Sequence, residues 1–248
     1  MLELKNICAG YGDRRILDNV TVTVEKGRLT SVIGVNGCGK STLLKTMLGI
    51  LPVLHGSVEI DGCDLRSMNR NEIAKKISYL PQGKNTPDMT VEQMVLHGRF
   101  PYLSYPRRYR SIDREIARDA INSVGISHLA DTPLYALSSG MRQNAYIAMA
   151  LAQDTDYILL DEPTTYLDIS NQLELMKLLK RLAEAGKGII AVMHDLPLAL
   201  RFSNDLIVIE NGGIRAKTTP SELCATSIVS EIFKTQIKSV DGNYYYDI

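Results

Sequence analysis

A glycine-rich run that ends in lysine and serine constrains this 248-residue chain more than any other feature of its sequence. The run covers residues 34–42 and matches the pattern G-x-x-x-x-G-K-[ST] in full. An apolar stretch, residues 30–33, precedes it, and a helical pattern of leucine and methionine follows. The sequence therefore predicts a strand, a tight phosphate-binding loop and a helix in direct succession.

Each residue type in this run suits a phosphate site. Glycines let successive backbone N–H groups turn toward phosphate oxygens, and the start of the next helix presents its positive dipole end to the same anion. Lys40 can reach the β- and γ-phosphates of a nucleotide, and the Ser41 hydroxyl is suited to ligating Mg²⁺. The predicted nucleotide contacts are Gly34, Asn36, Gly37, Cys38, Gly39, Lys40, Ser41 and Thr42, of which Cys38 occupies a variable position.

Two adjacent carboxylates, Asp161 and Glu162, follow a second apolar run at residues 157–160. Ligands of open α/β sheets gather at the carboxyl ends of the strands, so both side chains should lie near the phosphate loop. Asp161 would help to hold Mg²⁺, and Glu162 would orient and partly deprotonate an attacking water.

The wider pattern predicts an α/β fold. Four segments are apolar throughout, as expected of parallel strands buried on both faces: residues 30–33, 157–160, 189–193 and 206–209. Short strand-like runs joined by glycines in the first sixty residues indicate an added antiparallel sheet. Helical patterns dominate residues 90–153, where we expect no strand, and residues 221–233 also have a helical pattern.

Composition excludes several other classes of protein. Hydrophobic residues make up 45% and charged residues 23%, which is typical of globular chains. The longest apolar run, residues 145–152, is far shorter than the roughly 20 residues of a membrane-spanning helix. The N-terminus lacks the pattern of a secretory signal, and four cysteines without Cys-x-x-Cys spacing favour neither zinc nor disulfides. Equal numbers of basic and acidic residues argue against nucleic acid as a partner.

The order of these motifs resembles that of the ATP-binding subunits of ABC (ATP-binding cassette) transporters, over nearly the whole chain. The resemblance implies one P-loop NTPase domain, residues 1–248, with an N-terminal antiparallel β-subdomain and an inserted α-helical subdomain. Residues 1–87 and 154–225 would form the nucleotide-binding core with the β-subdomain. Residues 88–153 would form the helical subdomain with the signature motif, and residues 226–248 a C-terminal extension.

The resemblance also implies roles for single residues. Tyr11 matches an aromatic side chain that stacks on adenine, and Asp168 matches an acid in a loop that crosses a dimer interface. Gln82 matches a glutamine that touches Mg²⁺ and water and reports to the membrane partner, and His194 matches a histidine that contacts the γ-phosphate. The catalytic set is then Glu162, His194, Gln82 and Lys40, and the Mg²⁺ set is Ser41, Gln82 and Asp161.

The signature motif departs from the family pattern. The family usually reads Leu-Ser-Gly-Gly-Gln, whereas this chain retains Ser138 and Gly140 but has Ser139 and Met141 at the two variant positions. In the family, the residues that match Ser138 and Gly140 lie at a helix N-terminus. From there they approach the γ-phosphate that is bound by the other subunit. We expect the anion-binding geometry to survive and the closed dimer to be weaker or slower to form.

The resemblance implies ATP and Mg²⁺ as cofactors and three kinds of partner. A second copy would face the first head to tail with two ATP molecules between them, and integral-membrane permease subunits would respond to opening and closing. A solute-binding protein would take part indirectly. The chain would then lie in the cytoplasm, peripheral on the inner face of the cell membrane.

Three segments, residues 98–103, 148–153 and 162–169, look like those of ATPases that serve iron–siderophore, haem and cobalamin importers. Two alternatives stay open: a soluble ABC ATPase of iron–sulfur cluster assembly, and a weakly catalytic ATP-gated binding module. Six arginines against two acids lie between Arg99 and Arg118, with tyrosines interleaved. This region is either a solvated helix and loop or a surface near the permease or anionic lipid headgroups.

Overall fold

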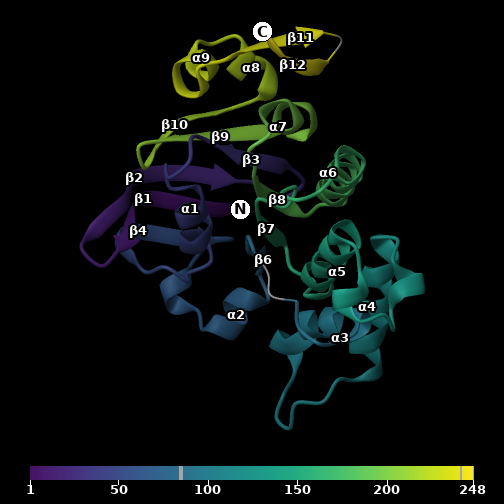
Figure 1. Ribbon diagram of the computed structural model, residues 1–248. Helices are drawn as coiled ribbons and strands as arrows, with labels where there is room; N and C mark the ends of the chain where they lie inside the picture. Colours follow the sequence, from purple (N-terminus) through teal and green to yellow (C-terminus); the bar gives the residue numbers. More distant parts are fainter. Residues whose placement is uncertain (84–85, 241, 248) are drawn as a thin grey trace.

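A twisted, mostly parallel sheet runs through the centre of the molecule, with helices on both faces (Figure 1). The computed structural model describes residues 1–83, 86–240 and 242–247. The strands are β1 (Leu2–Tyr11), β2 (Arg14–Val24), β3 (Leu29–Ile33), β4 (Val53–Ile60), β5 (Cys63–Asp64), β6 (Ile77–Leu80), β7 (Tyr157–Asp161), β8 (Gly188–Val192), β9 (Asp205–Glu210), β10 (Gly213–Thr218), β11 (Gln236–Val240) and β12 (Asn243–Asp247).

Among the described residues, the helices include four short 3₁₀ segments. The α-helices are α1 (Lys40–Met47), α2 (Arg70–Ala74), α3 (Val91–Leu96), α4 (Ser111–Ser123), α5 (Ser139–Ala152), α6 (Ile169–Glu184), α7 (Leu196–Phe202), α8 (Pro220–Cys224) and α9 (Ile228–Phe233). The 3₁₀ helices are η1 (Leu65–Ser67), η2 (His97–Tyr102), η3 (Ser127–Leu129) and η4 (Leu134–Ala136).

Within the described residues, the central sheet has six strands in the order β10-β9-β3-β8-β7-β6. β9, β3, β8, β7 and β6 run parallel, and β10 pairs antiparallel at the edge. Every residue of β3, β7 and β8 is buried, because helices cover both faces of the sheet. This arrangement confirms the predicted α/β fold and the four predicted apolar strands.

The N-terminal antiparallel sheet is confirmed as well, with the order β2-β1-β4-β5. Helix α1 lies between this sheet and the central one, and its side chains Leu43, Leu44 and Met47 are fully buried in the core that both sheets share. The loop that precedes α1 is therefore fixed between two sheets, which restricts how far it can move.

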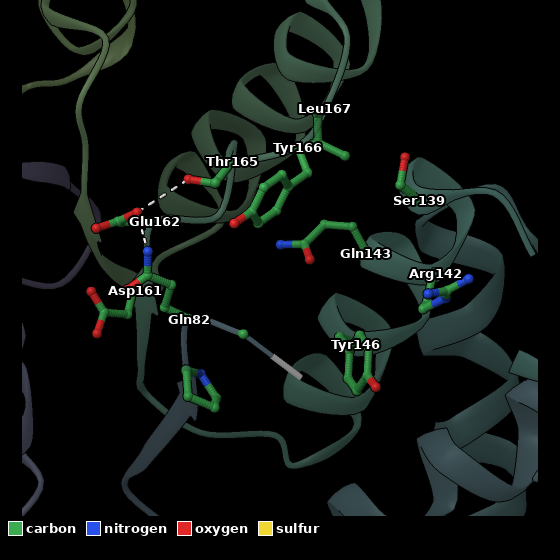
Figure 2. A pocket seen from close by; sticks show the side chains of 12 residues that line it. Gln82, Ser139, Arg142, Gln143, Tyr146, Asp161, Glu162, Thr165, Tyr166 and Leu167 are labelled. Atoms are coloured by element: carbon green, nitrogen blue, oxygen red, sulfur yellow. Dashed lines mark hydrogen bonds between the residues drawn. The ribbon is translucent and has the colours of Figure 1, made fainter. Parts of the chain in front are cut away.

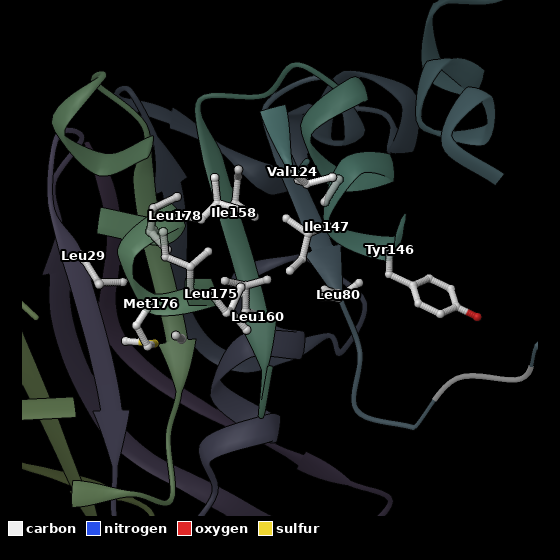
Figure 3. Packing of buried hydrophobic residues seen from close by; sticks show 14 of the residues in the cluster. Leu29, Leu80, Val124, Tyr146, Ile147, Ile158, Leu160, Leu175, Met176 and Leu178 are labelled. Atoms are coloured by element: carbon white, nitrogen blue, oxygen red, sulfur yellow. The ribbon is translucent and has the colours of Figure 1, made fainter. Parts of the chain in front are cut away.

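Residues 88–153 contain helices and no strand, as predicted, apart from one isolated bridge between Thr90 and Pro133. Helix α5 packs on the central sheet: Ile147 meets Leu80 and Ile158 in the same apolar cluster (Figure 3). The helical region and the sheet thus share one continuous core. Movement of α5 relative to β7 would have to disturb that packing.

The helical pattern predicted for residues 221–233 corresponds to two short helices, α8 and α9, which are separated at residues 225–227. Thr219 begins α8 with a capping box, and the Thr226 hydroxyl donates to the Leu223 carbonyl, 2.7 Å away, near its end. Within the part of the chain that the structure describes, no helix combines the length and apolar character needed to cross a membrane.

A buried acid, Asp113, contacts residues on both sides of the loop between η2 and α4, namely Arg99 in η2 and Arg110 directly before α4. Its Oδ1 lies 3.3 Å from Nε of Arg99, and its Oδ2 accepts from the backbone N–H of Arg110 at 3.0 Å. Burial raises the pKa of Asp113, but the hydrogen bonds from Arg110 and Arg99 outweigh it and hold that pKa below its ordinary value. Arg99, expected to belong to a basic surface, is only 4% exposed and serves the core.

We expect Asp113→Asn to lower the free energy of unfolding by about 3 kcal/mol or more, because it leaves the buried Arg99 guanidinium without a counter-charge. Urea denaturation measures this change, and Glu115→Gln on the exposed face of the same helix is the control. The low pKa of Asp113 stabilises the folded state above the unfolded carboxyl pKa of about 4. The difference between wild type and variant should therefore shrink as the pH falls below 4, and an unchanged difference would contradict the charge argument.

Candidate functional site

The phosphate loop leaves the end of β3 and enters α1. Gly34, Gly37 and Gly39 all have positive φ angles of 156°, 78° and 111°, which glycine adopts readily and other residues avoid. At Gly34 an added Cβ would lie 2.3 Å from the carbonyl oxygen of Ile209 in β9. Glycine at this position is therefore required both by the backbone conformation and by the close approach of the neighbouring strand.

The loop is exposed at its tip and buried at its base. Asn36 and Gly37 face solvent, while Gly34, Cys38 and Gly39 are buried. Burial raises the pKa of the Cys38 thiol, which packs beneath the loop as part of the core. Its side chain thus supports the loop from below, and only its backbone is available to a ligand.

Lys40 lies in the concave side of this loop and is only 6% exposed. Its Nζ donates to the carbonyl oxygens of Gly34 at 2.8 Å and Val35 at 3.0 Å. Since the ammonium group has three donors, it can hold the loop and still meet an anion. Thr42, also buried, follows in the first turn of α1.

Asp161 is the last residue of β7, and its side chain contacts the end of the phosphate loop at the carboxyl edge of the central sheet. The Ser41 hydroxyl donates to its Oδ1 at 3.0 Å, and the Tyr79 hydroxyl donates to its Oδ2 at 3.3 Å. Burial raises the pKa of Asp161, and neighbouring Glu162 adds to the rise, while the bonds from Ser41 and Tyr79 oppose it. No sequence motif singles out Tyr79, because the four residues of β6 carry too weak a pattern to identify it as the strand beside β7.

Glu162 contacts polar side chains from three different segments, and Figure 2 shows two of them, Gln82 and Thr165. Its carboxylate accepts from Nε2 of Gln82 at 2.5 Å and from the hydroxyl of Thr165 at 3.2 Å, and it lies 2.5 Å from Nε2 of His194. Its φ of 52° is unusual for a residue other than glycine. The surrounding contacts hold Glu162 in this conformation and fix the direction of its carboxylate.

The donor set at this edge fits a magnesium ion. Ser41, Asp161 and Gln82 offer hydroxyl, carboxylate and amide oxygens, the hard ligands that Mg²⁺ prefers. Ser41 and Asp161 already converge within hydrogen-bond distance. The partial burial that raises the pKa of Asp161 penalises its free carboxylate, and a bound divalent cation would remove that penalty.

A cavity of about 240 Å³ separates this edge from the start of α5 (Figure 2). Gln82, Glu162 and Tyr166 line one side, and Ser139 and Arg142 line the other. Arg142 donates to the Thr86 hydroxyl at 3.2 Å, and Gln143 donates to the Pro163 carbonyl at 2.9 Å. Helix α5 is therefore tied to the segments that follow both Gln82 and Glu162.

The signature residues begin α5 and are not part of the phosphate site of their own chain. Ser138 caps the helix by accepting from the Met141 N–H at 3.3 Å. At Gly140 an added Cβ would come within 2.9 Å of the Asn171 amide nitrogen, and that amide donates to Asp168 at 2.8 Å. Asp168 itself caps α6. The structure thus brings Gly140 and Asp168 together, through a residue that the sequence analysis missed.

Tyr11 ends β1 close to α1 and is 49% exposed. Lys45 from α1 lies 5.8 Å from the centre of its ring and 3.4 Å from its hydroxyl. The ring thus lies beside the helix that carries Lys40 and Ser41 and remains about half exposed. Lys45, like Tyr79 and Asn171, belongs to no motif that would single it out in the sequence.

Comparison with known proteins gives the family. A family model described as "ABC transporter" matches residues 17–165. This chain belongs to the ABC transporter ATP-binding family. The match covers the phosphate loop, the helical region and the acidic end of β7.

Curated relatives extend the similarity to nearly the full length. The chain is 42% identical over 96% of its length to the iron(3+)-hydroxamate import ATP-binding protein FhuC of Bacillus subtilis (strain 168), and covers 90% of that protein. It is 41% identical over 96% of its length to the ferric enterobactin transport ATP-binding protein FepC of Escherichia coli (strain K12), and covers 88% of it.

Solved structures agree on the fold. A nucleotide-free ATP-binding cassette from an ABC transporter aligns with a TM-score of 0.84 at 25% identity, covering 94% of this chain and 97% of that one. A dimeric cassette in a post-hydrolysis state, bound to ADP and Pi, aligns with a TM-score of 0.76 at 28% identity over 89% and 99% of the two chains. Dimers with bound nucleotide therefore occur in this family.

Proposed function

We propose that this chain binds and hydrolyses ATP with Mg²⁺ and drives the import of an iron chelate through separate permease subunits. One observation supports this most: the loop with Lys40 and Ser41 meets Asp161 and Glu162 at one edge of the sheet. This arrangement combines a phosphate cradle, ligands for a divalent cation and a positioned carboxylate. Phosphoryl transfer to water needs these three parts.

In this proposal each residue has a separate task. Backbone N–H groups of residues 34–42 and the Lys40 ammonium bind the phosphates, and Tyr11 stacks on the base. Ser41, Asp161 and Gln82 hold Mg²⁺, which neutralises charge that develops on the phosphate oxygens. Glu162 accepts a proton from the attacking water, and His194 keeps the Glu162 carboxylate directed and contacts the γ-phosphate.

The second half of the site would come from another copy of the chain. Ser139, which lies between Ser138 and Gly140 in the sequence, lines the cavity opposite Glu162, and no residue of the phosphate loop lines that cavity. A head-to-tail dimer would bring the start of α5 to the γ-phosphate of the partner, with Asp168 at the interface. Because ATP contacts both copies, it favours the closed dimer, and loss of the γ-phosphate removes that preference.

The division of the chain is part of the same proposal. Residues 1–87 with 154–225 form the nucleotide-binding core with the β-subdomain, residues 88–153 the helical subdomain, and residues 226–248 a C-terminal extension. The separate antiparallel, parallel and helical regions support it. We also propose that the chain works in the cytoplasm, held on the inner face of the cell membrane by the permease.

The cargo is inferred from relatives whose names specify iron chelates. The iron(3+)-hydroxamate import and ferric enterobactin transport ATP-binding proteins are 42% and 41% identical to this chain. A petrobactin import ATP-binding protein and an achromobactin transport ATP-binding protein match it at 40% and 37% identity. These names favour a ferric siderophore over haem or cobalamin, and over a role in iron–sulfur cluster assembly.

Uptake by reconstituted vesicles tests the proposal. The membrane proteins that copurify with the chain in mild detergent are inserted into vesicles with ATP inside and radiolabelled ferric siderophore, haem or cobalamin outside, with the solute-binding protein. We expect ATP-dependent uptake of the ferric siderophore. Copurification with soluble proteins alone, or uptake of haem or cobalamin instead, would contradict the proposed cargo. ATPase activity of the same preparation is measured separately, so a wrong cargo can be told from an inactive enzyme.

A further inference from the structure

The segment that contains the end of η2 and the loop from η2 to α4 carries the most concentrated positive charge that the proposed function does not use. We name residues 100–110 the arginine loop; it includes Arg107, Arg108 and Arg110, all exposed. No acidic residue occurs between residues 93 and 112. In Figure 1 the loop projects below α3 and α4, at the opposite end of the molecule from the C-terminal hairpin. Its surroundings are open to a large partner.

Large apolar and aromatic side chains are interleaved with these charges. Tyr105 is 97% exposed, and Phe100 and Ile112 are each 45% exposed. The Arg107 guanidinium lies 4.3 Å from the centre of the Phe100 ring, an arrangement that keeps both side chains at the surface. The loop therefore offers cations and apolar surface side by side, instead of a uniformly hydrated charge.

The base of the arginine loop is rigid. Asp113 binds Arg99 before the loop and Arg110 at its end, and Arg99 also donates to the Ala152 carbonyl at 2.8 Å. Arg99 and Arg110 therefore share Asp113, and the positive charges of Arg107 and Arg108 are exposed in the loop. Because the base is fixed, the entropy lost when the loop meets a surface is smaller than for a free segment.

Few acids oppose the exposed arginines. In the described part of the chain, neither Arg107, Arg108 nor Arg114 has a carboxylate within 4.0 Å. Arg110 shares the buried Asp113, while Glu115 is the next acid and lies on α4 beyond the loop. Since the whole chain has no net charge, any attraction by this region must be local.

We propose that the arginine loop and Arg114 form a contact surface for the anionic headgroups of a lipid bilayer. Guanidinium groups bind phosphate through paired hydrogen bonds, and tyrosine rings settle at the level of the headgroups. Anionic bilayers attract clustered basic side chains within about one Debye length. This surface would hold the helical region against the membrane independently of ATP turnover, so it does not depend on the proposed cargo.

Binding of the purified chain to vesicles tests this inference. Vesicles of phosphatidylglycerol and phosphatidylcholine should bind the chain, and vesicles of phosphatidylcholine alone should not. Each arginine near an anionic surface contributes about fivefold to partitioning. The triple variant Arg107→Ala, Arg108→Ala, Arg114→Ala should therefore partition on the order of 100-fold more weakly. Binding should also disappear in about 0.5 M salt, because ions screen the surface.

A second triple variant, Lys177→Ala, Lys180→Ala, Arg181→Ala, removes the same charge from exposed positions on α6. It should bind the anionic vesicles like the wild type. Equal weakening by both triple variants would mean that only overall charge matters and would overturn the proposal. Circular dichroism and the melting temperature of each variant confirm that the fold is retained.

A fluorescent reporter locates the contact. The chain contains no tryptophan, so Tyr105→Trp introduces a single one at the most exposed tyrosine of the loop. Its emission should shift to shorter wavelength with anionic vesicles. Tyr245→Trp, 54% exposed on the C-terminal hairpin, should not shift. No shift at residue 105, or a shift at both positions, would contradict the assigned surface.

Other occupants give different results. Soluble glycerophosphoglycerol should not release the bound chain; release would indicate a discrete phosphate site and overturn a membrane surface. If the Arg107, Arg108, Arg114 variant kept vesicle binding but failed to copurify with the permease, the loop would be a protein contact. The chain could also bind a short DNA duplex, at the same phosphate concentration as the anionic vesicles, as strongly as it binds the vesicles. That result would count against a lipid surface.

Discussion

Glu162→Gln should retain ATP binding, lose at least about 100-fold in turnover, and accumulate as an ATP-bound dimer. The substitution preserves size and removes the proton acceptor, and general-base catalysis typically contributes 10²–10⁴-fold to a rate. An amide can still accept from Gln82 and Thr165, so the segment after β7 should keep its shape. Without hydrolysis, the γ-phosphate would continue to bridge two copies and hold them together.

Two measurements on the purified variant separate binding from chemistry. Steady-state phosphate release reports turnover, and size-exclusion chromatography with ATP reports the dimer. Glu174→Gln is the matched control, since Glu174 is exposed on α6 and pairs only with Lys177 among the described residues. The control should hydrolyse ATP normally. Full hydrolysis by Glu162→Gln would remove Glu162 from the role of base, whereas loss of ATP binding would assign it to the nucleotide site instead.

The sequence predicted most of the fold because its strands are apolar on both faces. Runs such as residues 157–160 and 189–193 are typical of strands in a covered parallel sheet, and the pattern of residues 34–42 indicates a phosphate-binding loop. β6 and β10 carry weaker signals. β6 has four residues, including Ser78 and Tyr79, and β10 is an edge strand with alternating lysine and arginine. Their pairing partners, which are distant in sequence, decide their conformation.

The chemistry of the site was more predictable than its contacts. Motif spacing named Asp161 and Glu162, but it could not show that Tyr79 bonds to one and Thr165 to the other. Such contacts depend on which strand ends lie side by side. The number of charges along the chain placed Arg99 in a charged surface region, and this prediction is wrong for a similar reason. Its partner Asp113 is 14 residues away, and burial of the pair removes both from the surface.

Replacing Lys40 tests the phosphate-binding loop, as replacing Glu162 tests the proposed base. In the structure its ammonium is buried and bonds to the Gly34 and Val35 carbonyls, so Lys40→Ala should both loosen the loop and remove a charge from the phosphates. Truncating one partner of a buried charge pair costs about 2 kcal/mol or more, which corresponds to at least about 30-fold in affinity. Isothermal titration calorimetry with ATP should show this loss.

A series of nucleotides shows where the lysine acts. If Lys40 contacts the β- and γ-phosphates, the loss should be largest for ATP, smaller for ADP and absent for AMP, which is titrated at high concentration. Lys177 is an exposed lysine on α6, so the control variant Lys177→Ala should leave all three affinities unchanged. An equal loss for ATP, ADP and AMP would mean that the substitution collapses the loop as a whole. In that case the bonds from Lys40 to the loop carbonyls, and not a bond to phosphate, would be its main contribution.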